Sequence, residues 1–160
     1  MSQGSKERVE CALSGIGVSP GYAIGRAHLV DHTEVKVPKY HLDGSQTGRE
    51  VERFRRALTA SFEQIEHIKG KLQTAGDQHY LILEAHQLML QDEMLVEGVR
   101  EAITSQRLNA EWALNKVGRG IKKIFEGMED EYFRERRSDV DFVTERVMRN
   151  LMGTSHPSLS

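Results

Sequence analysis

The sequence is poor in the residues that would mark a secreted, redox or membrane protein. Among its 160 residues it has one cysteine, Cys11, three prolines and 6% aromatic residues. One cysteine can form neither an internal disulfide nor a zinc or redox motif that needs a second thiol. No apolar run reaches the length of a membrane-spanning helix, and the first ten residues lack the apolar core of a secretory signal. We therefore expect a cytoplasmic protein with no membrane partner.

A large net charge is also absent. The 22 Lys and Arg residues are set against 24 Asp and Glu residues, which gives a formal net charge of -2. This balance produces no overall basic field of the kind that attracts DNA or RNA, so we expect no nucleic-acid partner. Hydrophobic residues make up 38% and charged residues 29% of the chain. That composition is typical of folded, mainly helical proteins.

Two short apolar segments near the start have the β-compatible pattern of strands. Residues 13–18 and 22–30 flank Ser19-Pro20-Gly21, a turn triplet, which predicts a strand pair. An isolated pair is marginal in water and needs further sheet, which nothing later in the sequence supplies. Residues 17–21 also spell the G-x-S-x-G pattern of a hydrolase nucleophile, but Pro20 lacks the backbone N–H that its oxyanion hole requires. A turn between strands is the better interpretation.

From Thr47 onward the sequence has the period of helices. Thr47 and Glu50 form a T-x-x-E capping box at the start of a long helical pattern, which Ala75-Gly76 ends. Apolar residues recur in it at three- and four-residue steps, which predicts one buried stripe. The stripe consists of Val51, Phe54, Leu58, Phe62, Ile65, Ile68 and Leu72.

The following segment, from Asp77 to about Met94, has apolar residues over much more than one face. It could be a central helix packed on several sides, or a helix with an exposed apolar patch used for binding, and the pattern alone does not choose between them. Asp92 is expected to cap a short further helix, Asn109 caps another, and a last helix follows. We therefore predict a mainly α fold, an antiparallel helical bundle of two hairpins.

A metal site is the remaining chemistry that this region suggests. His79, Glu84 and His86 lie close in sequence, but Glu84 and His86 are two residues apart and so lie on different sides of a helix. Zinc ligands on helices are usually three or four residues apart, and there is no second cluster to complete the site. We predict no metal.

Three segments in series resemble Enzyme I, the phosphoenolpyruvate-protein phosphotransferase of the bacterial phosphotransferase system. They are GIGVSPGYAIGRA at 15–27, EAHQLMLQDEML at 84–95, and DEYFRER at 130–136 continuing to RNLMG at 149–153. The resemblance runs from about residue 13 to 153. It implies the strand pair and linker of an incomplete α/β subdomain over 13–43, a helical subdomain over 44–153, and the start of a return to the α/β subdomain over 154–160. The first residues are polar and mixed in charge, which predicts a flexible tail over 1–12.

In that family the helical subdomain binds the small phosphocarrier protein HPr. The returning α/β part holds a histidine, in a G-G-x-x-S-H type loop, that takes a phosphoryl group from phosphoenolpyruvate and passes it to HPr. A C-terminal barrel binds phosphoenolpyruvate with magnesium and forms the homodimer. This sequence reaches neither the loop nor the barrel, and His156, which lacks the paired glycines and precedes Pro157, is a decoy. We therefore expect no catalytic residue and no cofactor in this chain.

The resemblance also implies which residues face the carrier. Their chemistry is mostly apolar with an acidic rim, and HPr presents basic residues around an apolar patch. The implied positions are Asp77, Gln78, Leu81, His86, Leu88, Met89, Asp92, Met94, Leu95, Phe125 and Arg136. The expected function is a docking module for an HPr-like carrier within a phosphotransferase. The alternative is a non-enzymatic helical adaptor or scaffold that uses the same patch for another protein.

Overall fold

The computed structural model describes residues 12–16, 20–22, 24–25, 37–74, 80–128 and 137–153. Contacts divide the chain into two compact units, Met1–Glu34 and Val35–Ser160. The described residues of the first unit form loop and bends, so the strand pair expected at 13–18 and 22–30 is not seen in the described part of those ranges. A strand pair needs partners to be stable, and no strand of the described chain pairs with these residues. The rest of that prediction lies outside the described residues.

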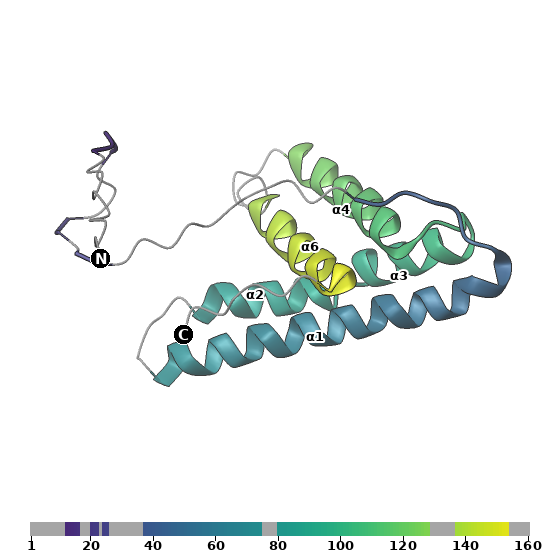
Figure 1. The fold of residues 1–160 in the computed structure, drawn as a ribbon, viewed down its shortest axis with the longest axis horizontal. Helices are drawn as coiled ribbons and strands as arrows, with labels where there is room; N and C mark the ends of the chain where they lie inside the picture. Colours follow the sequence, from purple (N-terminus) through teal and green to yellow (C-terminus); the bar gives the residue numbers. More distant parts are fainter. Residues whose placement is uncertain are drawn as a thin grey trace, which may run out of the picture. The chain divides into compact units, whose positions relative to one another are not determined.

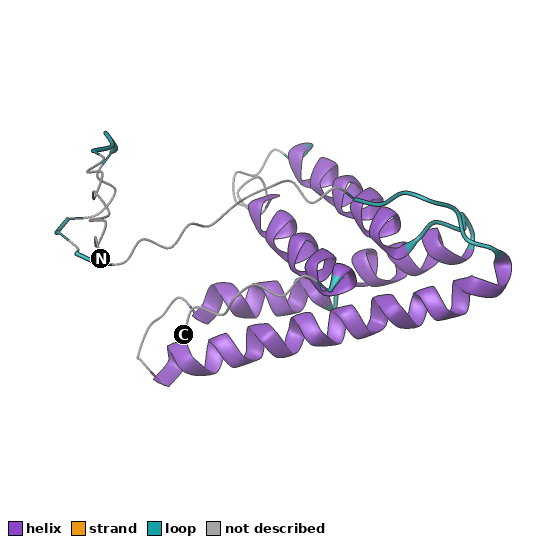
Figure 2. Ribbon diagram, in the orientation of Figure 1, coloured by secondary structure: helices purple, strands orange, loops and turns teal. Residues whose placement is uncertain are grey.

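The second unit is helical, and the predicted mainly α bundle is confirmed (Figures 1 and 2). A short 3-10 turn, η1 (Gly44–Gln46), leads directly into the longest described helix. The described α-helices are α1 (Thr47–Thr74), α2 (Tyr80–Leu90), α3 (Glu93–Thr104), α4 (Ala110–Glu126) and α6 (Arg137–Met152).

Two hairpins build the unit, as the sequence predicted. Helix α2 runs back along α1, and α6 runs back against α4, with α3 packed between α1 and α4 (Figure 1). Every described helix contributes apolar residues to one core, because each has an apolar face that only another helix can cover. The larger side chains in it that are no more than 2% exposed are Phe54, Ile65, Val99, Ile103, Leu114 and Val147.

The helix caps follow the sequence in part. Asp92 caps α3 as predicted, its side chain accepting a hydrogen bond from the Met94 N–H at 2.8 Å. The capping box predicted at Thr47 and Glu50 is wrong by one turn, because Thr47 already has helical backbone angles and the reciprocal pair is Asp43 with Gln46. The Asp43 N–H donates to Gln46 Oε1 at 2.9 Å. Glu50 is therefore free to bond elsewhere.

The segment that leads into the bundle is bound to its α3–α4 loop. Leu42 N–H donates to the Arg107 carbonyl at 2.6 Å, and Asn109 N–H donates to the Tyr40 carbonyl at 3.2 Å. Arg107 has a left-handed backbone (φ 55°), which turns the chain between α3 and α4. Leu42 is 7% exposed and belongs to the core. The helical unit thus includes residues that precede the predicted start at 44.

Candidate docking surface

Helix α2 has a buried side and an outward apolar side. His86, Gln87 and Leu90 are buried, whereas Leu81, Ile82 and Leu88 are 56%, 51% and 70% exposed. Leu81 and Leu88 are seven residues apart, which places them two turns apart on one face of the helix. Large apolar side chains grouped in this way on a surface are typical of a contact for another protein. Of the two interpretations left open by the sequence, the structure favours the exposed patch.

Polar contacts hold α2 in place against its neighbours. On the α1 side, Gln87 Nε2 donates to Glu66 Oε2 at 2.7 Å and Gln87 Oε1 accepts from Lys69 Nζ at 2.9 Å. On the α6 side, His86 Nε2 lies 3.3 Å from Asp139 Oδ1, within hydrogen-bond distance. Because both sides of α2 are tied, its outward face is a fixed surface.

Acidic residues predominate along this surface, although Glu97 pairs with Arg100 on α3. Residues 80–99 include four acids, Glu84, Asp92, Glu93 and Glu97, and no Lys or Arg. Lys69 of α1 also lies close, with its side chain 14% exposed and its Nζ 4.0 Å from Glu84 Oε1. An apolar face with an acidic border is complementary to a partner that has a basic border around an apolar patch.

The structure separates the predicted contact residues into three groups. Leu81, Leu88, Asp92 and Met94 are exposed, and Met94 is 50% exposed at the start of α3. Met89 and Phe125 are partly buried. His86 and Leu95 are buried, at 9% and 3% exposure, so in this structure they lie beneath the surface rather than on it. Asp77, Gln78 and Arg136 lie outside the described residues, as does the cap expected at Asp77.

The described residues offer no metal site and no membrane span. No group of three or more His, Cys, Asp or Glu side chains in the described ranges could hold a metal ion. None of the helices described is long and apolar enough to cross a membrane.

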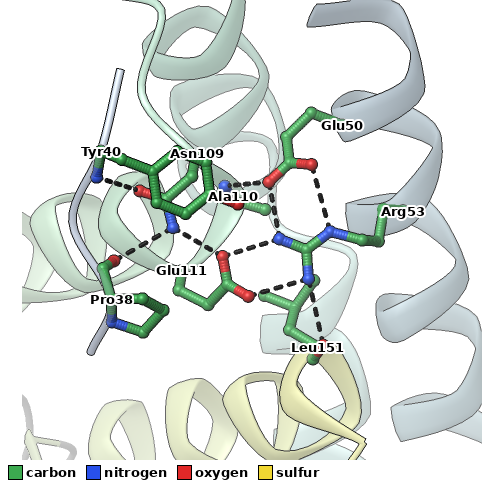
Figure 3. Close-up of polar contacts among 8 residues, drawn as sticks. All are labelled: Pro38, Tyr40, Glu50, Arg53, Asn109, Ala110, Glu111 and Leu151. Atoms are coloured by element: carbon green, nitrogen blue, oxygen red, sulfur yellow. Dashed lines mark hydrogen bonds and ion pairs between the residues drawn. The ribbon is translucent and has the colours of Figure 1, made fainter. Parts of the chain in front are cut away.

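A buried polar cluster, which the sequence did not reveal, lies where α1, α4 and α6 meet (Figure 3). The Arg53 guanidinium donates to both carboxylate oxygens of Glu111, at 2.8 and 2.7 Å, and to both of Glu50, at 3.1 and 2.6 Å. It also donates to the Leu151 carbonyl at 3.0 Å, near the end of α6. Glu50 in turn accepts from the Ala110 N–H at 2.7 Å, so it satisfies a free donor at the start of α4.

Asn109 extends this cluster to the incoming segment. It occupies the predicted cap position of α4, but its side chain makes no capping bond. Instead its Nδ2 donates to the Pro38 carbonyl at 3.0 Å and to Glu111 Oε2 at 2.7 Å, while its Oδ1 accepts from the Tyr40 N–H at 3.1 Å (Figure 3). One network therefore fixes the incoming segment and three helices.

The network also changes the pKa of Glu111 and of Arg53. Burial alone raises the pKa of Glu111, but hydrogen bonds from Arg53, from its own backbone and from Asn109 together hold its pKa below the ordinary value. The hydrogen bonds to Glu111 and then Glu50 raise the pKa of Arg53. Both groups are thus charged at neutral pH. These contacts make the cluster structural, whereas the face of α2 is the candidate functional surface.

The described fold is a helical domain built from two hairpins, with exposed apolar residues on one face of α2. Comparison with known proteins then identifies it: the chain belongs to the family described as PEP-utilising enzyme, N-terminal, whose profile matches residues 14–136. This confirms the resemblance to Enzyme I that the three sequence segments indicated.

Similar proteins agree with this family. The chain is 39% identical over 143 residues to the phosphoenolpyruvate-protein phosphotransferase of Cupriavidus necator and 37% identical over 149 residues to that of Bacillus subtilis. These matches cover 89% and 92% of this chain but 24% and 26% of the relatives, so the chain spans about a quarter of their length.

Solved structures show the same fold. An NMR solution structure of an Enzyme I protein matches with a TM-score of 0.69 at 34% identity, over 76% of this chain and 49% of that one. The N-terminal domain of Enzyme 1 - Nitrogen matches with the same TM-score of 0.69 at 20% identity, over 80% of this chain and 54% of that one. At that identity the second match concerns the fold alone.

Proposed function

We propose that this chain is the carrier-docking part of a phosphoenolpyruvate-protein phosphotransferase, and that its partner is a small phosphocarrier protein of the HPr type. Membership of the PEP-utilising enzyme family and 39% identity to a phosphoenolpyruvate-protein phosphotransferase support this proposal. The observation that carries it is the outward face of α2, where Leu81 and Leu88 are exposed above a border of acids.

The contribution of this unit is to hold the carrier in place. Phosphoryl transfer between two histidines needs the donor and acceptor aligned, and a docking surface supplies that alignment without taking part in the chemistry. In this proposal Leu88 and Leu81 contact the apolar patch of the carrier, while Glu84 and Asp92 attract its basic border. In this proposal phosphoenolpyruvate, magnesium and dimerisation are not assigned to this unit.

A binding measurement tests the proposal. The chain should bind a recombinant HPr protein weakly and reversibly in calorimetry or in an NMR titration, as transient signalling contacts do. Leu88→Asp places a charge in the centre of the contact and should weaken binding by about 2 kcal/mol, which is about 30-fold. Because Leu88 is 70% exposed, this change should leave the melting temperature nearly unchanged.

A substitution outside the proposed contact residues serves as the control. Thr59→Asp changes an exposed residue of α1 and should leave both folding and binding as they are. Absence of HPr binding by the wild-type chain, or equal binding by Leu88→Asp, would contradict the proposal. Binding of a different protein through Leu88, with none of HPr, would indicate the adaptor function instead.

A further inference from the structure

Phe142 is an exposed aromatic side chain on α6 beside the α2 surface. It is 62% exposed, although the neighbouring Val140 and Val143 are buried in the core. It lies outside the apolar stripe of its helix, so core packing does not account for an aromatic residue here. An exposed aromatic next to an apolar surface is a common feature of protein contacts.

Its ring is held in place by α2. The Phe142 ring stacks on the ring of His86 with centroids 5.9 Å apart and an angle of 16° between the planes. His86 is itself buried and bonded toward Asp139, one turn before Phe142 on α6. A ring that is already fixed loses little conformational entropy when a partner covers it. Phe142 should therefore lose less conformational entropy on binding a partner than an exposed side chain without such a contact.

The apolar surface of α2 continues toward this ring. Ile82 and Met89 lie four residues before and three residues after His86, so they share the side of α2 that carries His86. That side faces α6, because His86 contacts Asp139 and Phe142, whereas Gln87 contacts α1. Ile82 is 51% exposed and Met89 partly buried. The exposed apolar residues thus lead from Leu88 and Leu81 across Ile82 to Phe142.

We propose that Phe142 of α6 is an aromatic anchor of the carrier-docking surface and covers an aliphatic side chain of the carrier. The proposal rests on the proposed function and adds to it a contact residue. The occupant is the phosphocarrier protein rather than a second copy of this chain, because two copies would bring the acids of residues 80–99 together. A carrier with a basic border meets those acids favourably.

Affinity provides the first test. Phe142→Ala should weaken binding of recombinant HPr about tenfold in calorimetry, the loss expected for an anchor at a small contact. Met152→Ala is the matched control, since Met152 is also an exposed apolar residue of α6 (37%) but lies about 15 Å farther along the helix. It should change the affinity by less than about twofold. Thermal melts of both variants would show that the fold is kept.

Crosslinking provides a second test that does not depend on the stability of the alanine variant. The photoreactive p-benzoylphenylalanine placed at position 142 should crosslink to HPr on illumination, and the same group placed at position 152 should not. Because this group keeps the phenyl ring, it also preserves the stacking partner of His86.

The outcomes separate this proposal from the one on which it rests. If wild type binds HPr and Leu88→Asp weakens that binding, but Phe142→Ala binds normally and position 142 gives no crosslink, the assignment of Phe142 as an anchor is wrong and the docking function stands. If wild type binds no HPr at all, the docking function itself is wrong. Self-association that Phe142→Ala abolishes would overturn the choice of a carrier as the occupant.

Discussion

At the scale of single residues, Arg53 bonds to residues of three helices. Its guanidinium makes paired hydrogen bonds to Glu50 and Glu111 and a further one to the Leu151 carbonyl, so one side chain connects α1, α4 and α6. The two carboxylates are 11% and 6% exposed. Removing the cation would leave both of them buried without their main partner, and an unpaired buried charge is costly.

Arg53→Met should therefore lower the free energy of unfolding by about 2–4 kcal/mol. The estimate lies at the lower end for a buried pair because the Arg53 side chain is 35% exposed, and solvent screens part of the interaction. Urea denaturation at neutral pH measures the change.

Arg55→Met is the matched control for this prediction. Arg55 is on the same helix and pairs with Glu52, but its side chain is 67% exposed, so its loss should cost less than about 1 kcal/mol. Equal effects of the two substitutions would show that the cluster contributes no more than a surface ion pair.

At the scale of elements, small residues decide how closely α4 and α6 approach. A Cβ atom added at Gly118 of α4 would lie 2.7 Å from the Thr144 Cγ2 of α6, closer than real Cβ contacts. Thr144 is β-branched, and its hydroxyl donates to the Val140 carbonyl at 2.7 Å, so it cannot easily turn away. The close packing against Thr144 therefore explains why a glycine occupies position 118, although glycine lowers helix propensity.

Gly118→Ala should destabilise the protein by about 1–3 kcal/mol, because overpacking forces the two helices apart. Gly120→Ala on the same helix meets no atom within 4 Å and should stabilise it by up to about 1 kcal/mol through helix propensity. Thermal or urea unfolding of the two variants gives changes of opposite sign if the contact with Thr144 matters. A stabilising Gly118→Ala would refute the close approach of α4 and α6.

The helix caps show which features at a helix end can be predicted from the sequence and which cannot. The prediction of Asp92 as a cap is confirmed, because the signal is local: the aspartate and the N–H it accepts from are two residues apart. The T-x-x-E pattern at Thr47 was misleading because η1 begins the helical turn earlier, which leaves Glu50 facing α4. A glutamate three residues after a threonine fits a capping box, but in this structure the same glutamate, Glu50, bonds to the distant Ala110 instead.

At the scale of the whole molecule, the helical unit should fold without the residues before it. The first unit ends at Glu34, and the described core residues begin at Leu42. A chain beginning at residue 35 should therefore melt within a few degrees of the full chain, since it keeps every described core contact.

A chain beginning at residue 43 provides the comparison for that prediction. It loses the buried Leu42 and the hydrogen bonds of Tyr40 and Pro38 to Asn109, so its free energy of unfolding should fall by at least about 2 kcal/mol. Differential scanning calorimetry measures both truncations. Equal melting temperatures would mean that the segment 37–42 does not contribute to the stability of the bundle.

The sequence by itself determined the helices and most of their buried faces, because a helix has a fixed period and neighbours three or four residues apart share a face. It also indicated the family through three segments and singled out α2 as too apolar for a simple surface helix. These are properties of residues close together in the chain.

Only the tertiary structure decided which of the apolar residues are used for the core and which remain outside. Leu95 and Leu88 belong to the same sequence segment, yet Leu95 is 3% and Leu88 70% exposed, because the arrangement of α1, α3 and α4 covers one and not the other. The bonds of Arg53 to Glu111 and Leu151, and the contact of His86 with Asp139, join residues between 53 and 98 positions apart. No local pattern specifies such pairs, since they form only when separate helices pack together.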